Sequence, residues 1–199
     1  MVGPAGVMVP AVLRSPVRGA FTALAVVILA AGCGPSNGGA VEAKDYAKAV
    51  CGHLLRWKQG VASDGALLSQ QLRAKSADVA TVKAKYTAFF HGAVGRTDTL
   101  LEGLDRAGAP KVEDGVDYAR DLRAALAVTR TGLADARARF AALPTGDLRS
   151  YAAGSAKIRD ELGQAFVGVG AALDRLGRRY PDKALNSAFD QQPECKRLT

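Results

Sequence analysis

The sequence VATVKAKYTAFFHGAVGRTDTLLEGL, residues 79–104, has the spacing of an amphipathic helix. Its apolar or small residues recur at alternating steps of three and four, at Val79, Val82, Tyr86, Phe89, Ala93, Thr97, Leu100 and Leu104. Because an α-helix has about 3.6 residues per turn, this spacing places all of them on one face. A stripe sustained over about four heptads is typical of a helix that packs in a bundle.

Three further segments show the same spacing. One contains Ala119, Leu122, Leu126, Thr129, Leu133, Ala136, Phe140 and Leu143, and another contains Leu148, Tyr151, Ser155, Ile158, Leu162, Ala165, Val169, Leu173 and Leu176. The first segment of the chain contains Ala47, Val50, Leu54, Trp57, Val61, Leu68 and Leu72, and we expect a kink or short break near Ser63-Asp64-Gly65. No segment alternates apolar and polar residues as a half-buried strand would, so we expect no strands.

Short connectors separate the four segments. Ser76 is the predicted N-cap of the second helix, and Gly108-Ala109-Pro110 and Leu143-Pro144-Thr145 mark the next two boundaries. Short connections favour antiparallel neighbours. The sequence therefore predicts an all-α protein, an up-down-up-down four-helix bundle over residues 42–178. A short C-terminal extension, residues 179–199, is expected to close back on the first helix.

The composition is that of one globular domain. Of the 199 residues, 48% are apolar and 23% are charged, which excludes intrinsic disorder and collagen. No continuous apolar stretch reaches the ~18 residues expected of a membrane span, so a multi-span membrane protein is excluded as well.

The N-terminus has the features of a secretory signal. Arg14 and Arg18 precede the uncharged run AFTALAVVILAA, residues 20–31, which ends at Gly32-Cys33. A positive start, an apolar core of about 7–15 residues and small residues at the cleavage site define such signals. The run is shorter than the roughly 20 residues that a membrane-spanning helix needs.

Residues 29–33, Leu-Ala-Ala-Gly-Cys, resemble the lipobox of bacterial lipoproteins. The resemblance implies that residues 1–32 are a signal peptide, and that Cys33 becomes the lipidated first residue of the mature chain. Residues 33–41, which include Gly34-Pro35-Ser36-Asn37-Gly38-Gly39, then form a flexible tether. The expected location is the extracytoplasmic face of the bacterial cell membrane. The alternative is an ordinary secretory signal cut nearby, which would leave Cys33 as a free thiol.

Two cysteines remain once Cys33 is assigned to the lipid. Outside the membrane, two thiols in one small domain most often form a disulfide, so Cys51 and Cys195 are expected to pair. Two separate reduced cysteines are the alternative. Cys51 and His53 alone cannot supply the four ligands of a structural zinc site.

No motif for catalysis, cofactor binding or metal binding is recognisable. The two histidines, His53 and His91, lie far apart in the sequence and are interpreted as helix-surface residues, and Trp57 is expected to lie in the core. Gly163, Gly168 and Gly170 are interpreted as close helix contacts, and Asp114, Asp117 and Asp121 as a solvated acidic ridge.

These observations favour a membrane-anchored lipoprotein that binds or scaffolds, not an enzyme. The expected partners are the membrane, through a lipid on Cys33, and a protein or hydrophobic ligand of unknown identity. The net charge of +8 raises nucleic acid as a partner, but the export signal and the scattered positive residues argue against it. Alternatives are an enzyme acting on cell-envelope polymers and a metal-handling or sensor helical bundle.

Overall fold

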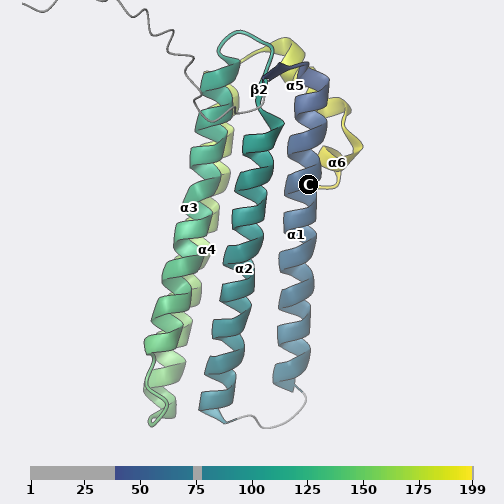
Figure 1. Cartoon of the computed structure of the whole chain (residues 1–199). Helices are drawn as coiled ribbons and strands as arrows, with labels where there is room; N and C mark the ends of the chain where they lie inside the picture. The colour runs from purple at the N-terminus through teal and green to yellow at the C-terminus, as the bar shows by residue number, and fades with distance from the viewer. Residues whose placement is uncertain (1–38, 74–77, 199) are drawn as a thin grey trace, which may run out of the picture. The chain divides into compact units, whose positions relative to one another are not determined.

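The computed structural model describes residues 39–73 and 78–198, and its elements are almost all helices (Figure 1). The predicted signal peptide, Cys33, most of the tether and Ser76 lie outside the described residues. The elements in chain order are β1 (Ala40–Val41), α1 (Ala43–Arg73), α2 (Val79–Ala107), β2 (Ala109–Pro110), α3 (Gly115–Ala142), α4 (Leu148–Arg179), α5 (Lys183–Gln191) and α6 (Pro193–Lys196). The predicted all-α class is confirmed.

The long helices pack in the order of the chain. α1 packs against α2, α2 against α3, and α3 against α4; in Figure 1, α1, α2 and α3 lie side by side and α4 lies behind α3. In the described part of the chain, α1 and α4 share few or no contacts. The C-terminal helices α5 and α6 pack instead against α1. One side of α1 is therefore covered by the end of the chain and not by α4.

The prediction of a kink or short break near Ser63-Asp64-Gly65 is wrong, because α1 runs without interruption from Ala43 to Arg73. Asp64 accepts two hydrogen bonds from Arg96 of α2, at 2.6 Å from Nε and 2.9 Å from Nη2. One glycine in a helix costs about 1 kcal/mol relative to alanine. Packing of α1 against α2 offsets this local cost at Gly65, which is why local sequence did not predict the continuity.

The expectation of no strands is also wrong, although the exception is small. β1 and β2 form a parallel pair of two residues each, with Ala40 opposite Ala109 and Val41 opposite Pro110. Two residues are too few to show an alternating pattern in sequence. Close beside this pair, a Cβ on Gly115 would overlap the carbonyl oxygen of Pro110, so only glycine fits at the start of α3.

Aspartates cap three of the helices. Asp78 is the N-cap of α2 and accepts from the backbone N–H of Thr81 at 2.9 Å, so the cap lies two residues after the predicted one, Ser76. Asp147 caps α4, and Asp182 caps α5 by accepting from the backbone N–H of Leu185 at 2.7 Å. Each carboxylate satisfies backbone donors that lack a partner within the helix.

The core consists of two clusters of buried residues. The Tyr46 cluster joins α1 through α5 and includes Tyr46, Val50, Leu100, Leu104, Leu122, Leu126, Leu176, Tyr180 and Leu185. The Phe140 cluster is built from α2, α3 and α4 and includes Phe90, Ala93, Val94, Leu133, Ala136, Phe140 and Ile158. α1 adds no buried residue to the Phe140 cluster. The C-terminal half of α1 is therefore held mainly by its contacts with α2.

Gly163, Gly168 and Gly170 of α4 do not make the close helix contacts expected of them. A Cβ added at Gly163, Gly168 or Gly170 would meet no heavy atom within 4 Å. Beside them, Phe166 and Val167 are 38% and 68% exposed. This stretch of α4 faces open space, because α3 is the long helix against which α4 packs extensively.

None of the helices in the described ranges is long and apolar enough to cross a membrane.

Candidate functional site

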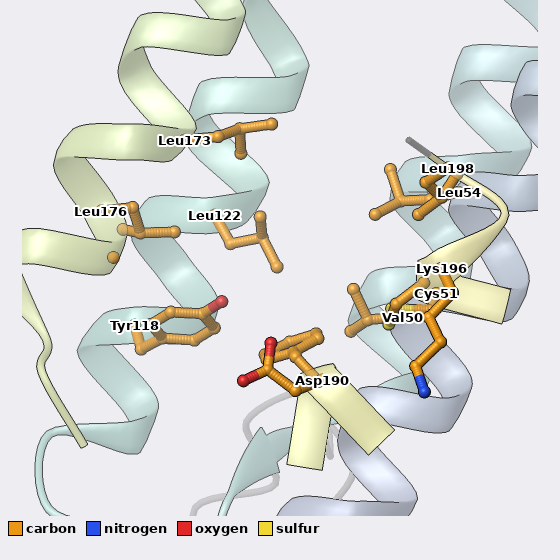
Figure 2. A pocket seen from close by; sticks show the side chains of 13 residues that line it. Val50, Cys51, Leu54, Tyr118, Leu122, Leu173, Leu176, Asp190, Lys196 and Leu198 are labelled. Carbon is orange, nitrogen blue, oxygen red and sulfur yellow. A yellow bond between two sulfur atoms is a disulfide. The ribbon is translucent and has the colours of Figure 1, made fainter. Parts of the chain in front are cut away.

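An apolar cavity of about 530 Å³ lies between α1, α3, α4 and the C-terminal segment (Figure 2). The helices contribute Val50, Cys51, Leu54, Tyr118, Leu122, Leu173, Leu176 and Gly177 to its wall. The cavity exists because α1 and α4 do not pack directly against each other, so the apolar face of α3 is left partly uncovered between them.

Helical spacing brings these side chains to the cavity. Val50 and Leu54 are one turn apart on α1, and Tyr118 and Leu122 are one turn apart on α3. On α4, Gly177 follows Leu173 by one turn and contributes no side chain, and a Cβ there would meet nothing within 4 Å. The glycine therefore leaves room at the wall that a larger residue would fill.

The C-terminal segment closes the cavity and contributes Phe189, Asp190, Cys195, Lys196 and Leu198 to its wall. Cys195 is joined to Cys51 by the expected disulfide, with the two Cα atoms 5.1 Å apart. The Nζ of Lys58 donates a hydrogen bond to the carbonyl oxygen of Leu198 at 2.7 Å. This wall is therefore held to α1 by one covalent and one polar contact.

Tyr118 supplies a neutral polar group that faces the cavity. Its ring packs edge-on against Tyr46 and Tyr180, with centroids 6.1 Å and 5.8 Å away, and also contacts Phe189. Its hydroxyl points into the space (Figure 2) and makes no hydrogen bond within the described residues. Burial raises the pKa of Tyr118 to about 12, so the hydroxyl is protonated at neutral pH and can donate.

Asp190 and Lys196 are the charged residues of the lining. Both are exposed, and in Figure 2 the Asp190 carboxylate points toward the side of Tyr118, whereas the Lys196 ammonium points away from the space. Their charges are opposite, so together they add no net charge to the cavity. The rest of the wall is aliphatic, aromatic or sulfur, which suits an apolar ligand.

The residues that the sequence singled out for chemistry are not brought together. His53 lies against Gly103 and within 3.0 Å of Arg56, and its pKa is lowered, first by burial and then by Arg56 and Arg106. Nδ1 of His91 on α2 lies 3.1 Å from Nη1 of Arg137 on α3, and α2 contributes no residue to the cavity. In residues 39–73 and 78–198, no group of three or more His, Cys, Asp or Glu side chains could hold a metal ion.

Trp57 lies in the Tyr46 cluster, where it is partly buried. Its Nε1 donates a hydrogen bond to Oγ1 of Thr97 on α2 at 3.0 Å. Thr97 in turn donates to the carbonyl oxygen of Ala93 at 2.8 Å, so the indole N–H and the buried hydroxyl are both satisfied. Trp57 is one turn from Leu54, beside the cavity, and does not line it.

Asp114, Asp117 and Asp121 were expected to form one solvated acidic ridge, but the structure gives them different environments. Asp114 precedes α3 in a left-handed conformation, with φ of 55°. Arg120 bridges Asp117 and Asp121, and Asp121 also accepts from the hydroxyl of Tyr180 at 2.8 Å and from Arg179 at 3.0 Å. Asp121 therefore fastens the end of α4 to α3. The Tyr180 hydroxyl is the main cause of its lowered pKa.

Sequence reasoning missed Tyr118 and Phe189 as site residues. Tyr118 was not in the predicted stripe, but it stands one turn before Leu122, which was, so its helix face was readable from the spacing. The hydroxyl of Tyr118 faces a cavity only because of where the C-terminal segment lies, and the spacing of residues in the sequence does not predict that position.

Comparison with known proteins found no matching family model, no matching curated protein and no matching solved structure.

Proposed function

We propose that this protein is a lipid-anchored, extracytoplasmic binding module without catalytic activity, and that it holds a hydrophobic ligand in its cavity. The observation that carries the proposal is the apolar cavity of about 530 Å³. Sites for small organic molecules are typically concave, mostly apolar and about 300–1,000 Å³ in volume, with a few polar groups that orient the ligand. The cavity has these features, and Tyr118 supplies an orienting group.

The proposed architecture is an up-down-up-down four-helix bundle with an open seam between α1 and α4. Successive packing of α1, α2, α3 and α4, with sparse contact between the first and the last, supports this arrangement. In a bundle closed on all sides, α4 would cover the face of α1 that carries Val50 and Leu54. Here the C-terminal segment covers part of that face and leaves the cavity.

The anchor gives the cavity a source of ligand. The lipobox resemblance of residues 29–33 supports lipidation of Cys33, which is only a few residues before β1. A lipid on Cys33 would keep the domain close to the membrane surface. A molecule that partitions into the bilayer is concentrated there, so a nearby apolar cavity meets it far more often than it would in bulk water.

The test is binding of N-phenylnaphthylamine, a neutral dye whose fluorescence rises in apolar sites. The variant Leu173→Trp places a larger side chain at the cavity wall and is expected to lower dye binding at least several-fold. The matched control is Val167→Trp, on the same helix at a position 68% exposed and outside the lining. Equal dye binding by both variants and the unaltered protein, or no binding at all, would contradict the proposal.

A further inference from the structure

The cavity combines a largely apolar wall with the hydroxyl of Tyr118 as its neutral polar group. The hydroxyl of Tyr118 points into the space and makes no hydrogen bond within the described residues (Figure 2). Tyr118 is half-buried and its hydroxyl is open to water in the cavity, so an apolar ligand that displaced this water would leave the donor unsatisfied, whereas a ligand oxygen placed beside it would accept the hydrogen bond. Since the phenol is protonated at neutral pH, it donates, and the ligand atom that meets it must be an acceptor.

The charge of the lining bears on whether this acceptor is ionised. An anionic group taken from water into an apolar site needs a cation or several donors to offset its lost hydration. The lining offers one phenol hydroxyl, and its two charged residues, Asp190 and Lys196, carry opposite charges. The site thus provides no excess positive charge for a carboxylate or phosphate, and the carboxylate of Asp190 would repel one.

The apolar residues along α1 and α4 indicate what the rest of the ligand is and in which direction it extends. Leu54 of α1 and Leu173 of α4 line the cavity, and both helices continue from there with apolar residues of the same cluster. Trp57 follows Leu54 by one turn, and Val169 precedes Leu173 by one turn. A flexible alkyl chain that starts near Tyr118 and passes Leu54 and Leu173 would therefore point toward Trp57.

We infer that the cavity binds a neutral single-chain lipid, of the fatty-acid ester class, whose oxygen accepts a hydrogen bond from Tyr118 while its alkyl chain extends toward Trp57. This inference rests on the proposed function, because it specifies the ligand of the same cavity. The inference excludes the carboxylate of a free fatty acid and the phosphate of a phospholipid as the polar group that the cavity prefers.

Trp57 is the single tryptophan of the chain, and bromine quenches indole fluorescence at short range, so brominated ligands report binding beside it. Three probes share one chain: methyl ω-bromoundecanoate, ω-bromoundecanoic acid and bromoundecane. They present a neutral oxygen acceptor, a carboxylate and no oxygen. Each is titrated into the purified protein at neutral pH, and Kd is obtained from the quenching of Trp57.

The ester is expected to bind most tightly. The variant Tyr118→Phe should raise Kd for the ester roughly three- to tenfold, the usual effect of one neutral hydrogen bond, and leave Kd for bromoundecane unchanged. The matched control is Tyr86→Phe, which alters a tyrosine of the Phe140 cluster outside the cavity. It should change no Kd, and the melting temperature of both variants verifies that they are folded.

The outcomes separate the inference from the proposed function. If bromoundecane binds as tightly as the ester, if the acid binds at least as tightly, or if Tyr118→Phe leaves ester binding unchanged, the inference is overturned and the apolar cavity remains a binding site. If no probe quenches Trp57 and N-phenylnaphthylamine does not bind either, the proposed function fails with it.

Discussion

Cys51 of α1 and Cys195 of α6 are joined by a disulfide that spans 144 residues and forms part of the cavity wall. Cys51 is 2% exposed and lies beside Val50 in the core. The bond therefore has two consequences: it links the two ends of the described domain, and it holds the C-terminal segment over the space that Tyr118 faces.

Removing the disulfide should lower stability. A loop of this length is worth at most about 5 kcal/mol in the chain-entropy model, and measured values of 2–4 kcal/mol are typical. For a protein of this size, this corresponds to a fall in melting temperature of roughly 5–15 °C, measured by calorimetry with and without reductant. The double variant Cys51→Ala/Cys195→Ala is the control, and its melting temperature should not respond to reductant. Identical melting temperatures for the oxidised and reduced protein would contradict the prediction.

The ion pair of Asp64 and Arg96 should contribute modestly and only above acidic pH. The hydrogen bond from Arg96 is the main cause that lowers the pKa of Asp64 below its ordinary value of 3.8. A lowered carboxyl pKa stabilises the folded state above the unfolded pKa, and that contribution is lost as pH falls through the folded pKa. The two side chains are 29% and 43% exposed, so Asp64→Asn should cost under about 1 kcal/mol at pH 7.

Denaturant unfolding at pH 7 and at pH 3 measures this difference. The cost of Asp64→Asn should shrink at the lower pH, and it should be small at either pH in an Arg96→Gln background, because the partner is then absent. A cost that is the same at both pH values would show that the carboxylate acts through something other than this pair.

Two glycines of α2 should respond in opposite directions to alanine. A Cβ at Gly95 meets no atom within 4 Å, so Gly95→Ala should raise the free energy of unfolding by about 0.5–1 kcal/mol through helix propensity. A Cβ at Gly103 would overlap the imidazole ring of His53, so Gly103→Ala should lower it. In a His53→Ala background that penalty should disappear. Stabilisation by both alanines would refute the proposed contact between Gly103 and His53.

The histidines should be dispensable for ligand binding. His53 packs on Gly103 and His91 lies beside Arg137, and neither lines the cavity. The double variant His53→Gln/His91→Gln should therefore bind N-phenylnaphthylamine as the unaltered protein does. If dye binding is lost while the melting temperature stays normal, a role for a histidine in the site would replace the present proposal.

Lipidation of Cys33 is tested in cells. Cys33→Ala should abolish labelling by a fatty-acid analogue and leave unprocessed precursor, because the acceptor thiol is absent. Detergent phase partitioning and the mass of the protein provide the measurement. Cys51→Ala/Cys195→Ala is the matched control and should be labelled normally. Equal labelling of Cys33→Ala and the unaltered protein would show that Cys33 is not the acceptor.

The helices and their buried faces were largely predictable from spacing. In α3, for example, the predicted stripe contains Leu122, Leu126, Thr129, Leu133, Ala136 and Phe140, all of which are buried. Helix faces are readable because the 3.6-residue period is a local property of the backbone. Prediction failed at Ser63-Asp64-Gly65, where contacts with α2 maintain a helix that local propensity disfavours.

The candidate site was only partly predictable. The two cysteines that remain once Cys33 is assigned to the lipid predicted a disulfide, because pairing follows from compartment and number. The cavity could not be predicted, since it exists only where α4 fails to cover α1 and the segment carrying Phe189 and Cys195 lies across the gap. The open glycines of α4 show the same limit: periodicity assigns a residue to a helix face, and only packing between distant segments decides whether anything lies against that face.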